Sequence, residues 1–184
     1  MSDKKMIIDL CLTETSKDPV KIVEKLMAQP GVPMHGPVHH VLVGSALLTA
    51  YHNAGGEIDL AKALEEMSAR GNQVPGGICG LWGACGAAIS TGQFLSIATG
   101  SAPLNNQVWG LCNRMTAKAL ESIGQLDGPR CCKRDSFLAI LAAVDFAAEQ
   151  LGVQMEKTMP VCSRSGINPQ CLKEGCMFHG GSEG

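Results

Sequence analysis

The sequence predicts an all-α protein, a compact bundle of about six helices with a cysteine-rich, metal-stapled C-terminal tail. Aromatic residues make up only 4% of the 184 residues, whereas apolar residues make up 45%. A core with so few rings must be filled by small and aliphatic side chains, which favours close-packed helices. The length suits one domain with a sizeable core. We therefore expect a helical domain over residues 1–155 and a tail over residues 156–184.

Capping and turn signals place the helices along the chain. Asp18 offers a capping oxygen directly before Pro19, so a helix begins there and runs to about Ala28. Residues 38–53 are apolar on nearly every side, as expected of a central helix. Asp59 is expected to cap a helix over residues 60–70, and Asn105 or Asn106 is expected to cap a helix over about residues 107–123. Two further helices are expected over about residues 85–98 and 137–151. Residues 6–12 are expected to form a short strand or a docking arm.

Charge and hydropathy narrow the class of protein. The net charge of −2 argues against nucleic-acid binding. Residues 71–113 carry no charged side chain, but polar residues and glycines interrupt the segment throughout, so it predicts a buried core and not a membrane span. The apolar run after Met1–Lys5 is too short and too polar for a signal peptide. We expect a cytoplasmic protein without a nucleic-acid or membrane partner.

Nine cysteines, an odd number, point to metal binding or catalysis in a cytosolic chain. Two of them, Cys79 and Cys85, lie in the uncharged, glycine-rich segment 75–92. Repeated glycine indicates close approach of another backbone, a cofactor or a cluster. Cys85 is expected near the first turn of a helix, whose dipole favours a thiolate. The alternative is a tightly packed helix with two inert core cysteines.

Cys131 and Cys132 are adjacent in the segment 128–136, between a Gly-Pro turn and a helix. Neighbouring cations at Arg130, Lys133 and Arg134, together with the helix N-terminus, are expected to lower the thiol pKa values. Adjacent cysteines do not easily form an unstrained disulfide, so cluster ligands, metal ligands and a working dithiol all stay open.

Three of the five histidines precede or begin the central helix, as His35, His39 and His40. One interpretation is a hydrogen-bonded core histidine with two surface ones. The other is that His39 or His40 points into the same site as the cysteines.

The tail carries four further ligand candidates, Cys162, Cys171, Cys176 and His179. The segment has too little apolar material to fold alone, and a bound metal would supply the missing stability. Three cysteines and a histidine suit zinc or an iron–sulfur cluster. The spacing is close to that of CCCH zinc fingers, but both later gaps are one residue short. A loose extension is the alternative.

Three motifs of this chain resemble a family of proteins from strict anaerobes, including methane-producing archaea. They are HGPVHH at residues 35–40, PGGICG and ACGAA within residues 75–88, and GPRCCKR at residues 128–134. The resemblance covers about residues 34–179. Domains of that family also occur attached to methyltransferase-like proteins, so the resemblance implies an anaerobic enzyme system as the context.

A more distant resemblance is to the proposed redox-active proteins with a C…GCAxxG…C…C pattern. Cys85-Gly86-Ala87 and Cys131-Cys132 stand at matching places. Where that pattern has a cysteine in its first helix, this chain has His39-His40, so the resemblance implies a mixed cysteine and histidine site. The group is associated with iron–sulfur binding, and the resemblance implies a cluster here.

The expected function is an iron–sulfur protein that acts in electron transfer, or in cluster or sulfur handling, for an anaerobic enzyme system. The cofactor, such as a [4Fe–4S] cluster, is expected to be bound by residues from this set: Cys79, Cys85, Cys131, Cys132, His39 and His40. Zinc or a second iron–sulfur cluster is expected in the tail.

Two alternatives stay open. One is a thiol-dependent enzyme that transfers sulfur or methyl groups through the Cys131-Cys132 pair. The other is a zinc-stapled interaction module. The expected partner is a redox, methyl-transfer or sulfur-transfer protein, and the helices rich in small residues leave a homo-oligomer open.

Overall fold

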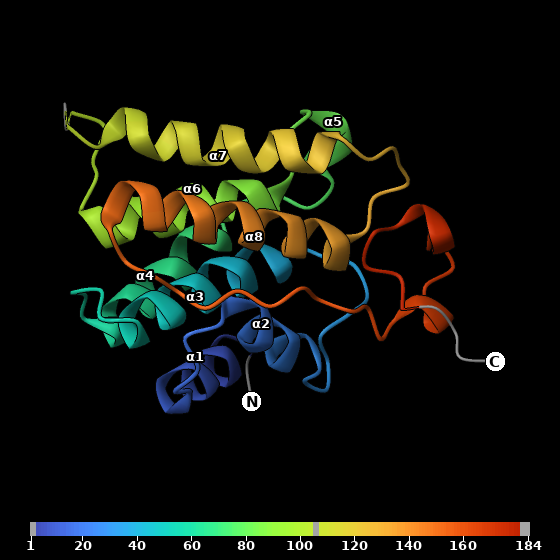
Figure 1. Cartoon of the computed structure of the whole chain (residues 1–184), viewed down its shortest axis with the longest axis horizontal. Helices are drawn as coiled ribbons and strands as arrows, with labels where there is room; N and C mark the ends of the chain where they lie inside the picture. Colours follow the sequence, from blue (N-terminus) through green and yellow to red (C-terminus); the bar gives the residue numbers. More distant parts are fainter. Residues whose placement is uncertain (1–2, 105–106, 181–184) are drawn as a thin grey trace.

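The computed structural model describes residues 3–104 and 107–180, and it confirms the all-α class (Figure 1). In this part of the chain there is no β-strand, only an isolated bridge between Cys162 and His179. The helices are α1 (Asp3–Thr13), α2 (Pro19–Met27), α3 (His39–Asn53), α4 (Leu60–Gly71), α5 (Ile78–Leu81), α6 (Gly86–Thr99), α7 (Trp109–Gly124) and α8 (Cys132–Leu151), with short 3₁₀ helices at Ser165–Ile167 and Lys173–Gly175.

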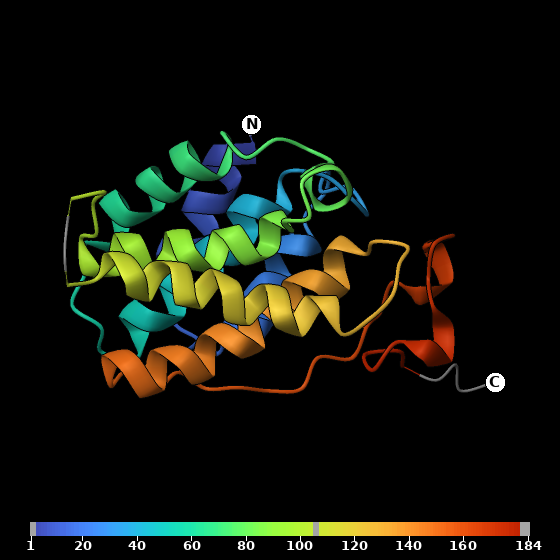
Figure 2. The same ribbon diagram turned by 90° about the horizontal axis from the view of Figure 1, so that it is seen from above.

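Helix α3 is the centre of the bundle, as its uniform apolarity predicts. It packs against α1, α2, α4, α6 and α8, and its residues from His39 to Tyr51 are all buried. Close approach of the helices depends on glycine: a Cβ at Gly44 would collide with Met67 of α4. Figures 1 and 2 show α6, α7 and α8 stacked over this central helix.

Two capping predictions, at Asp18 and Asp59, are confirmed. The Asp18 carboxylate accepts a hydrogen bond from Val20 N at 2.9 Å, and Pro19 is the first residue of α2. The Asp59 carboxylate accepts from Lys62 N at 3.1 Å at the start of α4. Each bond satisfies an amide that the helix itself leaves unpaired.

Three expectations differ from the structure. Residues 6–12 lie within helix α1 and are neither a strand nor an extended arm, because the helical spacing buries Ile7, Ile8 and Cys11 in the core. Helix α8 begins at Cys132 and not at Phe137, so the first turn contains the basic residues. Helix α1 and the one-turn helix α5 bring the number of α-helices in the described residues to eight, where about six were expected. The predicted cap at Asn105 or Asn106 lies outside the described residues.

The tail returns along the bundle and ends beside the N-terminus of α8, on the right in Figure 1. Glu156 N donates to Lys17 O at 2.9 Å, and Thr158 Oγ1 donates to the Asp18 carboxylate at 2.7 Å. Phe178 is buried, and its ring packs edge-to-face on Phe137 with 5.5 Å between centroids. The tail is therefore packed against the helical domain. No described helix has the length and apolarity needed to cross a membrane.

Candidate functional site

Helices α3, α5, α6 and α8 all begin at one end of the bundle, and residues from their first turns line a common pocket of about 190 Å³. We call it the head pocket. Its wall brings together most of the predicted cofactor residues from four separate segments: Cys79, Cys85, Cys132, His39 and His40. Arg130 and Asp135 line it as well. The positive ends of several helix dipoles therefore meet around three thiols, which favours negative charge there.

A second, smaller cavity of about 20 Å³ lies between the start of α8 and the tail. We call it the tail cavity. Four cysteines line it, one at the N-terminus of α8 and three in the tail: Cys131, Cys162, Cys171 and Cys176. His179 also lines the cavity, so all four predicted tail ligands surround one space.

The adjacent cysteines Cys131 and Cys132 line different cavities. Cys131 is the N-cap of α8 with extended backbone angles, whereas Cys132 is the first helical residue. The change of backbone conformation at this point turns the two side chains apart. The structure thus separates two cysteines that the sequence analysis placed at one site. Cys131 lines the tail cavity together with the cysteines of the tail, whereas Cys132 lines the head pocket.

The tail sulfurs accept hydrogen bonds from amides. Arg164 N donates to Cys162 Sγ at 3.4 Å, and Lys173 N donates to Cys171 Sγ at 3.3 Å. In both cases the donor lies two residues after the cysteine. Asn168 Nδ2 donates to Cys131 Sγ at 3.7 Å. Donors directed at sulfur stabilise a thiolate and are a means of tuning a metal centre.

The expected lowering of the thiol pKa values is wrong for the metal-free protein. Burial raises the pKa of Cys85 to about 12, even though two amides of α6 donate to its sulfur. Burial also raises the pKa values of Cys131 and Cys132, despite amide donors and nearby arginines. Desolvation of the thiolate outweighs the helix terminus and the cations, so these thiols are protonated at neutral pH.

The two histidines of the head pocket differ in what their ring nitrogens can still bind. His39 Nδ1–H donates to Gly36 O at 3.0 Å, and its Nε2 accepts from Lys133 Nζ at 3.0 Å. Burial lowers the pKa of His39 to about 3, so the ring is neutral with both nitrogens engaged. His39 is therefore the hydrogen-bonded core histidine of the first interpretation.

His40 keeps a free lone pair. Its Nδ1–H donates to Val74 O at 3.1 Å, and burial lowers its pKa. Nε2 has no hydrogen-bond partner among the described residues, and this edge of the ring lies directly against Gly86. A Cβ at Gly86 would collide with the imidazole. A neutral histidine whose other nitrogen is fixed by a carbonyl is the usual form of a metal ligand.

A bridge of hydrogen bonds joins the two cavities, and sequence reasoning missed it. Cys132 N donates to His35 Nδ1 at 3.3 Å, and His35 Nε2–H donates to Asn168 Oδ1 at 3.2 Å. The amide of Asn168 then donates to Cys131 Sγ. The sequence gives His35 no ligand role, and no sequence signal marks Asn168, which lies 133 residues further along the chain.

Two buried cations lie beside the tail cavity. Lys133 is 2% exposed, and burial lowers its pKa to about 8, although neighbouring thiols favour its charged form. Arg134 Nε donates to the Asp135 carboxylate at 3.0 Å, and Nη2 donates to Pro129 O at 3.3 Å. The third nitrogen, Arg134 Nη1, is buried without a hydrogen-bond partner among the described residues. An unpaired buried donor is costly, and Arg134 lines both the tail cavity and a second pocket beside Cys79 and Cys85.

Among residues 3–104 and 107–180, no three His, Cys, Asp or Glu side chains lie close enough to hold a single metal ion. The four cysteines of the tail cavity, one from α8 and three from the tail, line a common space.

The fold and its two cavities define an all-helical protein with thiol-lined sites at one end of the bundle. Residues 7–179 match DUF5714, described as a family of unknown function, and the chain belongs to that family. The matched range includes all nine cysteines. No curated protein and no solved structure matches the chain.

Proposed function

We propose that this protein is an iron–sulfur protein that transfers single electrons, with a cluster bound in the tail cavity by Cys131, Cys162, Cys171 and Cys176. The observation that carries the proposal is that four cysteines, from α8 and from three points of the tail, line one small cavity. Four thiolates are the usual ligand set of [2Fe–2S] and [4Fe–4S] clusters. When bound, the cluster supplies one-electron chemistry.

The groups around the cavity support a negatively charged occupant. The amides of Arg164 and Lys173 donate to ligand sulfurs, and Asn168 Nδ2 donates to Cys131 Sγ. The buried Lys133 and Arg134 lie beside the cavity and offset the added negative charge. A buried protonated thiol is a weak nucleophile but becomes a ligand by losing its proton, so cluster loading releases protons.

A second centre is proposed for the head pocket, with Cys79, Cys85, Cys132 and the Nε2 of His40 as ligands. The supporting observation is the meeting of three thiols and a free imidazole lone pair at the ends of several helices. His39 is left out, because both of its ring nitrogens are already hydrogen-bonded.

The experiment is iron and acid-labile sulfide analysis with a visible spectrum, on protein purified without oxygen. We expect iron and sulfide in about equal amounts. Cys176→Ser should lower both, whereas the matched variant Cys112→Ser should not, because Cys112 lines neither cavity. His179→Ala should leave iron unchanged if four cysteines suffice. Cys132→Ser tests the head pocket, because it should lower metal content without loss of the tail centre.

Two results would redirect the proposal. Zinc without sulfide would favour the zinc-stapled interaction module. Metal-free protein in which one cysteine is alkylated rapidly and stoichiometrically would favour the thiol-transfer enzyme.

A further inference from the structure

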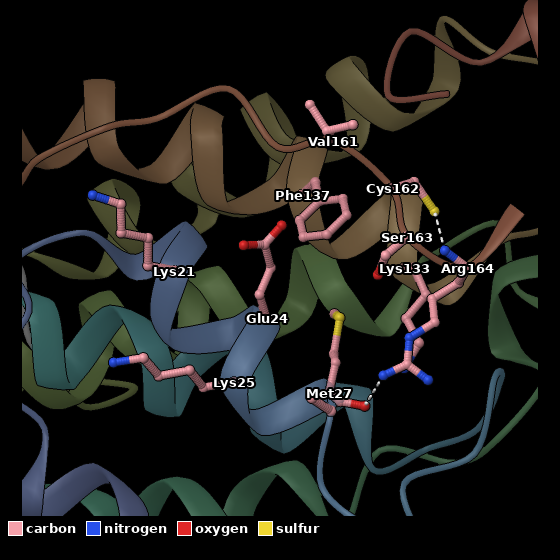
Figure 3. Close-up of a pocket in the computed structure, with 11 residues that line it drawn as sticks. Lys21, Glu24, Lys25, Met27, Lys133, Phe137, Val161, Cys162, Ser163 and Arg164 are labelled. Atoms are coloured by element: carbon pink, nitrogen blue, oxygen red, sulfur yellow. Dashed lines mark hydrogen bonds between the residues drawn. The ribbon is translucent and has the colours of Figure 1, made fainter. Parts of the chain in front are cut away.

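A groove of about 540 Å³ runs between α2, the first half of α8 and residues 161–164 of the tail (Figure 3). Its apolar lining comes from Met27 and Phe137, which are each 4% exposed, and from Val161, which is 66% exposed. Val161 is therefore the apolar side chain of this lining that a protein partner can contact most fully.

The outer layer of the groove is cationic. Lys21 and Lys25 have side chains that are 53% and 56% exposed. Their carboxylate partners lie beneath them, since the Asp18 side chain is 0% exposed and that of Glu14 is 9% exposed. The described lining of the groove thus carries four cationic side chains, from Lys21, Lys25, Lys133 and Arg164. Glu24 is the one carboxylate among the described lining residues, and burial raises its pKa.

The groove reaches the proposed cluster through Cys162, which lines both the groove and the tail cavity. Arg164 connects the tail to α2 at this side of the groove, because its backbone amide donates to Cys162 Sγ and its Nη2 donates to Met27 O at 3.2 Å. Both bonds are visible in Figure 3. Arg164 thus adds a third cation beside a cluster ligand.

We infer that this groove is the docking site for an acidic electron-transfer protein, which exchanges one electron with the tail cluster through the side of Cys162. The inference rests on the proposed function. Opposite charges steer such partners together, and weak redox complexes need only a small contact area. The electron leaves the reduced partner and is taken up by the oxidised cluster, and no bond is formed or broken.

The test uses a reduced plant-type [2Fe–2S] ferredoxin, a strongly acidic protein, as the probe partner. In stopped-flow mixing at low salt, the double variant Lys21→Glu/Lys25→Glu should slow reduction of the cluster by about tenfold or more. Added salt should slow the wild-type reaction. Reduction by dithionite should be equal in both proteins.

The matched control is Lys4→Glu/Lys62→Glu, which reverses two exposed lysines that are also ion-paired, on α1 and α4. This control should react like the wild type. Equal rates for the groove variant and the wild type would overturn the inference, and so would equal slowing by both variants.

Direct binding separates this inference from the proposed function. Calorimetric titration with oxidised ferredoxin needs no electron transfer, and the groove variant should lose binding that the control keeps. Protein without a cluster refutes the proposed function, whereas a cluster-loaded protein with no charge-dependent binding refutes only the docking site. Binding of RNA or anionic vesicles at this face, with no ferredoxin binding, would also overturn it.

Discussion

Phe178→Ala is expected to release the tail without touching any proposed ligand. Phe178 is 2% exposed and packs on Phe137, so its truncation leaves a cavity at the contact between the tail and α8. Truncation of a buried phenylalanine to alanine typically costs about 3–5 kcal/mol. A change of about 1.4 kcal/mol in free energy alters an equilibrium constant tenfold, so the fraction of molecules with an undocked tail should rise at least about a hundredfold.

Hydrogen exchange of the metal-free protein measures this opening. Cys162 N donates to Phe178 O at 2.7 Å, a backbone bond within the tail next to the buried ring, so exchange of the Cys162 amide reports whether this part of the tail keeps its fold. The Cys162 amide should exchange much faster in Phe178→Ala, while amides in α3 should keep their protection. Phe178→Leu is the control and should lie between the two. An unchanged exchange rate at Cys162 would refute the view that this ring anchors the tail.

Three further predictions concern the environment of the cavities. Gly86→Ala should displace the imidazole packed on it and lower metal uptake by the head pocket, whereas Gly80→Ala, which meets no neighbour within 4 Å, should not. Asn168→Asp keeps the acceptor oxygens but replaces the donor to Cys131 Sγ by a negative charge, so voltammetry should give a more negative reduction potential at unchanged iron content. Burial lowers the pKa of His39 from 6.5 to about 3, so the folded state binds fewer protons than the unfolded state in this range. The free energy of unfolding should therefore fall as pH drops from 6.5 towards 3, and urea titrations of metal-free His39→Asn should show a smaller fall.

The parts of the fold that depend on local chemistry could be predicted from the sequence. Asp18 and Asp59 cap helices because a short carboxylate reaches the free amides one turn away, and this needs no knowledge of the rest of the chain. The central position of residues 39–53 follows from their uniform apolarity.

The arrangement of the site could be predicted only in part. The sequence identified the cysteines of both cavities, but not that Cys131 and Cys132 separate, because this depends on where α8 begins. It also misjudged the thiol pKa values, since charged neighbours are visible in the sequence and burial is not. The bridge from His35 to Asn168 joins residues that only the tertiary fold brings together.

X-ray absorption at the iron edge, on protein purified without oxygen, tests the central claim most directly. The account predicts iron with a first shell of sulfur and with a second iron nearby, and loss of this signal from the tail centre in Cys171→Ser. Absorption at the zinc edge with no iron, or iron surrounded by oxygen and nitrogen with no neighbouring iron, would contradict it.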